Sequence, residues 1–516
     1  MRNDLLKRRD WFKSAAVLRI SGATAGCRIA RAWSDEPDTA INIGSQRQLW
    51  CDDYLIEIND GAQRKLHQPQ KVNDGQPVLR LEQPWEELGT PILGTVLRDR
   101  GKFRMWYRGG GGGPRGGVWC FAESDDGLKW NKPSLGLIEH QGTRQNNIYV
   151  LGQPQAYTPF VDPNETNPAR RYKSAVSSLR IDTALAHSPH GLVWTPYRGG
   201  AAITGRASDT ISQVLWDPFA RVYRLYTRTD YGTSQTGEVR GTRDMIAASD
   251  ADLSDPKSWR KVRQWCLGWE RGDREYHKVR QLYSVNGWIY EGVQFALIWA
   301  LELGAVDLSA GEKAVRETMN AYLATTRDGK PWSLEWIYDN RPLFPRGESG
   351  RFDSRWIQPA PNIITWKDKH WLYYAGLARS HNGQWSPHIT GAKGGIGLAT
   401  IRRDGFISLH AGARSVSVTT KALCFRGNTL TINAITAPTG DLRAEMQDAA
   451  GKPFSGFTLA DCEKITGDDI DRVVRWKKGS DVSRLAGKPI RIRFALRGAD
   501  LFSMKFGKSA SRIDTP

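Results

Sequence analysis

Hydrophobic and polar residues alternate over short stretches along most of the chain, and these stretches are rich in aromatic residues. Alternation with a period of two predicts a half-buried β-strand, and aromatic and β-branched residues favour that structure. The pattern therefore predicts an all-β fold. The clearest stretches are FRMWY (103–107), RYKSAV (171–176), VYRLYT (222–227), GWIYEG (287–292) and HWLYYAG (370–376).

A turn that ends in an aromatic residue follows each of these stretches. Asp-Gly and related pairs are typical hairpin turns, in which Gly takes a positive φ and Ser or Asp bonds to the turn amides. We expect the closing aromatic ring to hold the hairpin on its sheet, so that the turns are scaffold. The turns are SDDGLKW (124–130), SPHGLVW (188–194), SDADLSDPKSW (249–259), TRDGKPW (326–332) and RRDGF (402–406).

The closing aromatic residues repeat at a nearly constant interval. They stand at positions 130, 194, 259, 332 and 406, with spacings of 64, 65, 73 and 74 residues. A repeat of this length, built from short strands, predicts one four-stranded sheet per repeat and a ring of such sheets. We therefore predict a five-bladed β-propeller over residues 41–412.

The pattern changes after Gly412. Short alternating strands continue without aromatic turns, which predicts a β-sandwich over 413–516. Two smaller elements are expected within the propeller. The segment 308–322 (LSAGEKAVRETMNAY) is the one predicted helix, and the strand 49–57, which contains Asp52 and Asp53, is expected to close the last blade.

Residues 1–40 are typical of an export segment. Arg8 and Arg9 precede an aromatic pair and a stretch of small residues, which resembles a twin-arginine signal, although Arg19 interrupts the apolar stretch. The residues before Cys27 resemble a lipoprotein cleavage site without its leucine. A disordered basic start is the alternative. We expect export to the periplasm or the medium.

Composition narrows the classes of partner. The formal net charge is +18, which favours an acidic partner such as a sulfated or uronic polysaccharide, with diffuse surface charge as the alternative. No block of Lys and Arg or recognition helix indicates nucleic acid. No run of about twenty apolar residues predicts a membrane span. We expect a monomer.

The six cysteines show no spacing typical of a zinc site, and we predict no metal and no cofactor. Cys424 and Cys462 could pair in an oxidising compartment. Buried free thiols are the favoured interpretation.

A five-bladed propeller followed by a sandwich resembles the glycoside hydrolases of the invertase, levanase and arabinanase type. Several phrases resemble bacterial proteins labelled family 32-like hydrolases, although the invertase signatures WMNDPNG, RDP and EC are absent. The resemblance implies a glycoside hydrolase, and the missing signatures argue against fructan specificity. The phrases are LWCDDYLIE (49–57), PWE (84–86), TPFVDPN (158–164), SDT (208–210) and YTR (226–228).

Hydrolysis of a glycosidic bond needs two carboxyl groups, one protonated as general acid and one ionised. In a propeller the innermost strand of each blade lines the central funnel, so acids near the starts of these strands are the catalytic candidates. For each acid, a capped turn or an ion pair is the alternative. The candidates are Glu86, Asp162, Asp209, Glu275 and Asp353; Glu348 lies beside the last.

We expect Asp162, Asp209 and Glu275 to converge at the funnel floor, with Glu86 and Asp353 close by. Asp209 and Asp162 would stay ionised, whereas burial and neighbouring carboxylates would raise the pKa of Glu275, the general acid.

Four further residues are candidates for substrate binding. Arg228 and Arg243 follow Asp209 and could hold a sugar carboxylate or sulfate, or pair with neighbouring acids instead. Trp85 could stack on a sugar ring, and His277 could contact a hydroxyl group.

Two other functions fit parts of the pattern. The turns resemble the Asp box of sialidases, but that motif has one more residue between Asp and Gly, and sialidases use six blades. A non-catalytic carbohydrate-binding propeller would keep aromatic and arginine groups without a catalytic acid pair.

Overall fold

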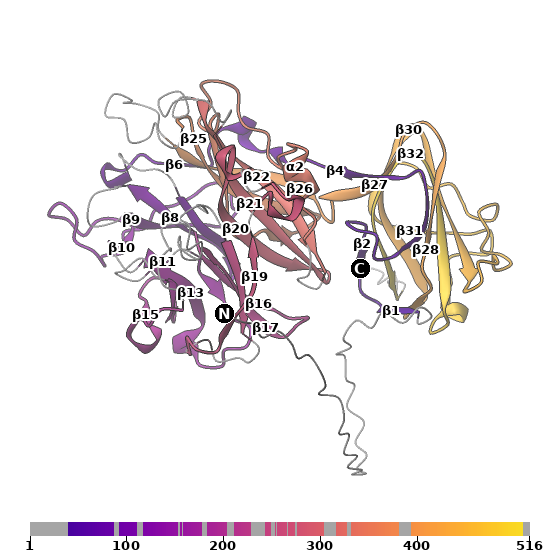
Figure 1. Cartoon of the computed structure of the whole chain (residues 1–516), viewed down its shortest axis with the longest axis horizontal. Helices are drawn as coiled ribbons and strands as arrows, with labels where there is room; N and C mark the ends of the chain where they lie inside the picture. The colour runs from indigo at the N-terminus through magenta and orange to yellow at the C-terminus, as the bar shows by residue number, and fades with distance from the viewer. Residues whose placement is uncertain are drawn as a thin grey trace, which may run out of the picture. The chain divides into compact units, whose positions relative to one another are not determined.

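The computed structural model describes residues 40–86, 92–110, 117–152, 155–156, 158–177, 183–203, 211–228, 243–248, 253, 255–265, 267–273, 276–303, 316–327, 332–380 and 394–508. Regular structure in these ranges is almost entirely β, with short 3-10 turns and a four-residue α-helix, α2 (Glu335–Tyr338) (Figure 1). The all-β prediction is confirmed. The predicted export segment, apart from Ala40, lies outside the described residues.

Three sheets follow one another along the first half of the chain, and each is an antiparallel succession of neighbouring strands. The first contains β7 (Ile92–Asp99), β8 (Lys102–Gly110), β9 (Val118–Ser124) and β10 (Ile148–Leu151). The second contains β11 (Gln155–Ala156), β12 (Phe160–Val161), β13 (Tyr172–Ser177), β14 (Thr183–Ser188) and β15 (Thr195–Pro196). The third contains β16 (Gln213–Asp217), β17 (Val222–Arg228), β18 (Arg243–Ala248) and β19 (Trp259–Trp265).

The next strands form one nine-stranded sheet, in which a single parallel pair joins β22 to β23 and the other pairs are antiparallel. Two short strands from the N-terminal side pair with β26 and complete this sheet. The sheet contains β20 (Arg280–Tyr290), β21 (Val293–Glu302), β22 (Thr318–Thr326), β23 (Trp356–Pro359), β24 (Ile364–Trp366), β25 (Lys369–Leu377), β26 (Gly395–Arg402), β5 (Gln70–Lys71) and β6 (Leu79–Arg80).

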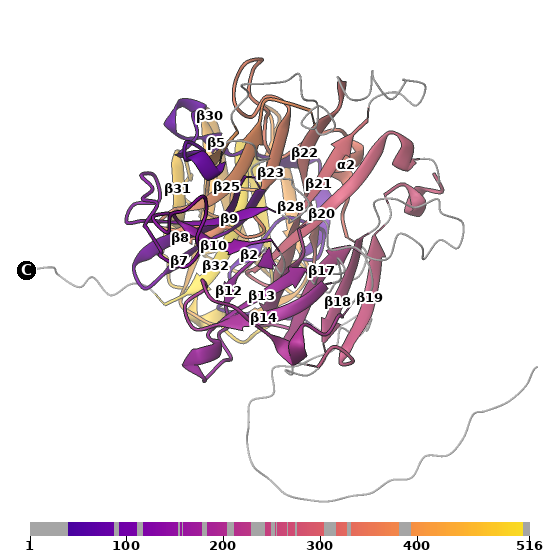
Figure 2. The same ribbon diagram turned by 90° about the vertical axis from the view of Figure 1, so that its left-hand side faces the viewer.

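The sheets are arranged in a closed order. Each contacts the next in sequence, and β23, β24 and β25 return to contact β7 of the first sheet (Figure 2). This is the order that a propeller requires. Because β20–β26 form one continuous sheet, the number of five blades stays a prediction.

Two buried glutamines connect strands of different sheets. The Gln213 amide in β16 donates to the carbonyls of Gly287 (2.8 Å) and Pro361 (2.6 Å) and accepts from the Gly287 amide (2.6 Å). Gln358 in β23 accepts from the Leu93 amide in β7 (2.7 Å) and donates to its carbonyl (3.2 Å). Since a buried amide left without partners costs free energy, these bonds fix the spacing of the strands.

The aromatic turns have the chemistry that the sequence predicts. Ser124 Oγ accepts from the Gly127 amide (2.9 Å), Asp126 accepts from the two amides after Gly127, and Gly127 has φ +75°. The closing ring of Trp130 donates to the Gly127 carbonyl (3.2 Å), and so does the Tyr373 hydroxyl of β25 (2.8 Å). This turn is therefore also a contact with a neighbouring sheet.

The second turn repeats this contact with the first sheet. Gly191 has φ +83°, and its carbonyl accepts from Trp106 Nε1 of β8 at 2.6 Å. A Cβ atom at Gly191 would lie 2.7 Å from Trp106. The glycine is thus required both by the turn and by the close approach of the indole.

The last part of the chain forms a ten-stranded sheet around the long strands β30 and β32 (Figure 1). Its apolar side chains form a continuous core that includes Trp50, Phe494 and Trp476. The strands are β1 (Ile41–Gly44), β2 (Gln48–Leu49), β3 (Ile56–Asp60), β4 (Gln63–Leu66), β27 (Ile407–Ala411), β28 (Val416–Thr420), β29 (Leu423–Phe425), β30 (Thr429–Asp448), β31 (Asp468–Val473) and β32 (Ile490–Gly507).

One prediction about a local element is wrong, and a second is contradicted over part of its length. Residues 49–57 do not close the last blade: β2 pairs with β32 and β3 with β28, whereas β5 and β6 pair with β26. Pairing is set by partners distant in sequence, which strand periodicity does not identify. Of the predicted helix 308–322, residues 308–315 lie outside the described residues, and 318–322 belong to strand β22, which continues the β20–β21 hairpin register.

The ten-stranded sheet combines two separate parts of the chain, 41–66 and 407–507. Strands from both sides of the predicted propeller segment contribute to it, so the boundaries at 41 and 412 stay a prediction.

Cys424 and Cys462 carry free thiols, as do Cys51 and Cys120, which agrees with the favoured interpretation. Among the helices described, none is long and apolar enough to span a membrane.

Candidate functional site

Three of the predicted catalytic acids, Glu86, Asp162 and Asp353, lie in the described part of the chain, and all are buried. Each accepts hydrogen bonds from a lysine ammonium group and a tyrosine hydroxyl. This combination of carboxylate, cation and tyrosine is called here an acid cluster.

Glu86 lies in the 3-10 turn Pro84–Glu86, which precedes β7. Its Oε1 accepts from the Tyr107 hydroxyl (2.6 Å), and its Oε2 accepts from Lys132 Nζ (2.7 Å). The amides of Glu82 and Gln83 also donate to Oε2, both at 2.9 Å. Both oxygens are therefore engaged in fixing this turn against β8, where Tyr107 lies.

Asp162 connects the second and third sheets. Its Oδ2 accepts from Lys173 Nζ of β13 (2.8 Å) and from the Tyr223 hydroxyl of β17 (2.7 Å), while Oδ1 accepts from the Asn164 amide (3.0 Å). Lys173 also binds Glu165 at 2.8 Å. Although burial alone would lower it, the bonds to Asp162 and Glu165 raise the pKa of Lys173, so its ammonium group keeps its charge.

Asp353 differs from the other two acids in the hydrogen bonding of one carboxylate oxygen. Its Oδ2 accepts from Lys71 Nζ (2.6 Å) and the Tyr374 hydroxyl (2.9 Å), but its buried Oδ1 has no partner among the described residues. Gly347 lies directly against that oxygen, since a Cβ atom there would be 2.1 Å from it. Of these three carboxyl groups, Asp353 is the one with an oxygen left to bind another group.

The other predicted site residues are described in part or not at all. Asp209 and Glu275 lie outside the described residues. Arg228 and Arg243 are opposite each other in the β17–β18 ladder, and nothing further is described of their side chains or of the His277 side chain. Trp85 is half-buried and donates to Asn147 Oδ1 (2.8 Å), with its ring packed against the core of the first sheet. The convergence of the acids therefore stays a prediction.

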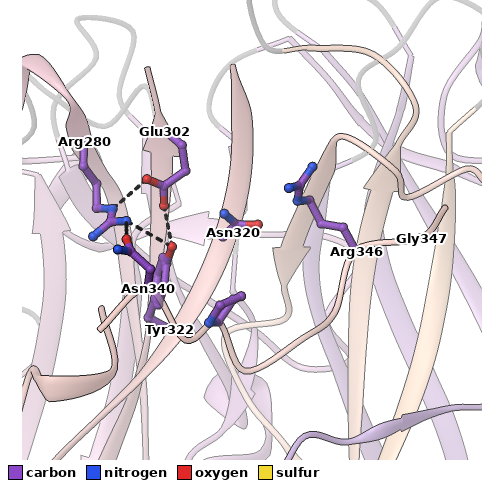
Figure 3. Close-up of a pocket in the computed structure, with 8 residues that line it drawn as sticks. Arg280, Glu302, Asn320, Tyr322, Asn340, Arg346 and Gly347 are labelled. Carbon is purple, nitrogen blue, oxygen red and sulfur yellow. Dashed lines mark hydrogen bonds and ion pairs between the residues drawn. The ribbon is translucent and has the colours of Figure 1, made fainter. Parts of the chain in front are cut away.

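A pocket of about 460 Å³ opens at the ends of β20, β21 and β22. Its volume falls within the range of ligand sites, about 300–1,000 Å³. Polar side chains dominate its lining (Figure 3). The lining residues are Arg280, Glu302, Asn320, Tyr322, Asn340, Pro342, Arg346 and Gly347.

One wall of the pocket is a fourth acid cluster. Arg280 Nε donates to Glu302 Oε2 (2.7 Å), and the Tyr322 hydroxyl donates to Glu302 Oε1 (2.6 Å). Burial, and then the negative charge of Glu302, raise the pKa of Tyr322, so the phenol stays protonated and donates. Asn340 Oδ1 and the Ile337 carbonyl accept further bonds from Arg280.

The opposite side of the pocket carries unmatched groups. In Figure 3, Asn320 lies between this cluster and Arg346, which comes from the loop before β23. Asn320 is 8% exposed, and its Oδ1 has no hydrogen-bond partner in the described part of the chain. Gly347 completes this side and contacts Asp353 behind it. The pocket thus adjoins one of the predicted acids.

Sequence reasoning missed this pocket. Arg280 and Glu302 are direct partners in the β20–β21 hairpin, which turns at Glu291 and Gly292. Counting outward from that turn would have paired Glu302 with Gln281 instead, because a β-bulge between Leu282 and Ser284 shifts the register by one residue. Arg346 and Asn340 carry no such signal, because they lie in an irregular loop. No group of three His, Cys, Asp or Glu side chains that could hold a metal occurs among the described residues.

No protein-family profile matches the chain, and no curated protein is significantly similar to it. Solved structures similar to this one include a family 32 β-fructofuranosidase from Bombyx mori, 10% identical over 84% of this chain and 95% of that one, with a TM-score of 0.37. An exo-inulinase from Aspergillus awamori is 10% identical over 86% and 99% of the two chains, with a TM-score of 0.36. An endo-1,4-β-xylanase from Bacteroides thetaiotaomicron is 14% identical over 65% and 96%, with a TM-score of 0.38.

Proposed function

We propose that the protein is a glycoside hydrolase that cleaves a poly- or oligosaccharide with a pair of carboxyl groups. The supporting observation is the order of the acids and the strands along the chain. Glu86, Asp209, Glu275 and Asp353 precede β7, β16, β20 and β23, the first strands of their repeats. Gln213 and Gln358 join these strands to one another, which favours a common site for acids at their starts.

The roles follow from the chemistry of glycoside hydrolysis. Asp209 attacks the sugar or activates water, and Glu275 protonates the leaving oxygen. Asp162, which accepts a hydrogen bond from Lys173, stabilises the positive charge that develops on the sugar ring. Asp353 uses its unpartnered Oδ1 to orient a substrate hydroxyl. Arg228, Arg243, Trp85 and His277 remain the proposed substrate-binding residues.

A panel of neutral, uronic and sulfated oligosaccharides tests the proposal. The purified protein is incubated with each glycan, and the appearance of new reducing ends is followed by chromatography. Cleavage of at least one glycan is expected. If a glycan binds but none is cleaved, the protein is a carbohydrate-binding propeller instead; if a sialoside is the substrate, the sialidase alternative replaces this one.

We also propose that the protein is exported through the twin-arginine route and acts outside the cytoplasm as a monomer. The paired Arg8 and Arg9 support the route. Changing both to Lys should retain the protein in the cytoplasm of its host, as judged by fractionation and immunoblotting. Unchanged export of the double variant would show that the arginine pair has no such role.

A further inference from the structure

The pocket at the ends of β20–β22 has an uncompensated positive charge. Glu302 and Arg280 neutralise each other at 2.7 Å. Arg346 donates to the Ser354 carbonyl (3.1 Å) and forms no ion pair with a carboxylate of the described residues. Arg355 likewise has no described ion pair. Arg355 does not line the pocket, so Arg346 is the group that leaves this side of it cationic.

The two arginines are close enough to affect each other. Partial burial and then the charge of Arg355 lower the pKa of Arg346, whereas Tyr322 and Glu302 act weakly in the opposite direction. Like charges held near each other raise the free energy of the empty protein. An anion bound to Arg346 would relieve that repulsion.

Asn320 supplies a second, independent indication of a ligand. Its side chain is buried in the pocket wall, and its Oδ1 lacks a donor. A buried acceptor without a partner costs free energy, and such groups in native proteins call for an explanation. A sugar hydroxyl in the pocket would provide the missing donor.

We propose that this pocket binds an acidic sugar residue. Arg346 holds its carboxylate or sulfate group, Arg355 reinforces the positive field, and Asn320 Oδ1 accepts a hydrogen bond from a ring hydroxyl. Planar guanidinium groups suit both oxyanions, because each presents paired oxygens to the N–H fork. The inference rests on the proposed function only in taking a glycan as the ligand.

Isothermal titration calorimetry with three matched probes tests this site. The probes are trigalacturonate, a sulfated galactan trisaccharide and neutral galactotriose, each titrated into the full-length protein. At least one acidic probe should bind more tightly than the neutral one. Arg346→Gln should weaken that binding about tenfold, as expected for one charge-assisted hydrogen bond, and Arg346→Lys should weaken it less.

Arg414→Gln is the matched control, since it removes one exposed positive charge outside the pocket. Tighter binding of trigalacturonate or of the sulfated probe identifies the oxyanion and supports the site, provided that Arg414→Gln binds like the parent. Equal binding of all three probes, or an equal loss in Arg346→Gln and Arg414→Gln, overturns it. Cleavage products are measured in the same mixtures. Binding of an acidic probe without any cleavage contradicts the proposed hydrolase but supports the acidic-sugar site. Cleavage of neutral glycans without a preference for acidic probes supports the hydrolase but contradicts the site.

Discussion

The Asp162 cluster and the Glu302 pocket contain the same three kinds of group, a carboxylate, a cation and a tyrosine hydroxyl, and they differ in what remains unmatched. Around Asp162 every carboxylate oxygen has a donor, and Lys173 and Tyr223 come from two neighbouring sheets. Beside Glu302, the pocket retains a cation, Arg346, and an orphan acceptor, Asn320 Oδ1. A closed cluster joins sheets, whereas an open one has capacity left for a ligand.

A further closed cluster joins the propeller segment to the ten-stranded sheet. Asp404, in the turn RRDGF, accepts from Tyr290 (2.6 Å), Arg47 (3.1 Å), Ser503 (2.6 Å) and Asn433 (3.1 Å). Its side chain has no exposed surface. Donors bind both oxygens of this buried carboxylate, as they do at Asp162.

The largest effect is expected when a closed cluster is broken. Asp162→Asn leaves Lys173 buried with one carboxylate instead of two, and removing one partner of a buried pair costs about 3–5 kcal/mol. Urea unfolding at neutral pH should show a loss near the lower end of that range, because Glu165 remains. Glu165→Gln, at the more exposed side of the same lysine, should cost about 1 kcal/mol or less. Equal losses of stability in the two variants would show that Asp162 matters no more than Glu165 as a partner of Lys173.

A smaller effect is expected at Asp99, a closed cluster between the first two sheets. The hydrogen bond from Arg171, opposed by burial and aided by Tyr172, lowers the pKa of Asp99 to about 2. Because the folded-state pKa is lower than the unfolded value of 3.8, the ionised carboxylate stabilises the folded protein at pH values above 3.8. This stabilisation of about 2 kcal/mol is lost as the pH falls from about 4 to 2. Asp99→Asn should lose this amount at pH 7 and show a flatter unfolding curve between pH 4 and 2. A pH profile identical to that of the parent would contradict the linkage.

The smallest effect on stability is expected in the open pocket. Because Arg346 forms no described ion pair, Arg346→Gln should change the free energy of unfolding by less than about 0.5 kcal/mol. Urea denaturation compares it with Arg414→Gln. A loss of 2 kcal/mol or more at Arg346 would show that this arginine, too, is part of the scaffold.

The scaffold was more predictable from the sequence than the site. Local rules predict the turns at Gly127 and Gly191, because positive φ and side-chain bonds to nearby amides involve residues a few positions apart. The role of a carboxylate depends on donors brought from elsewhere: Lys71 reaches Asp353 across 282 positions. Contacts between residues distant in sequence also explain why the predicted pairing of 49–57 was wrong and why Arg346 was missed.

The proposed hydrolase depends most directly on Asp209 and Glu275, the two acids assigned to bond cleavage. The decisive measurement is the rate of hydrolysis of the glycan identified by the panel, for Asp209→Asn and Glu275→Gln beside the parent, with thermal melts of all three. We predict a loss of at least about a hundredfold in each variant with an unchanged melting temperature. Two variants that melt like the parent and retain nearly its full rate would contradict the account.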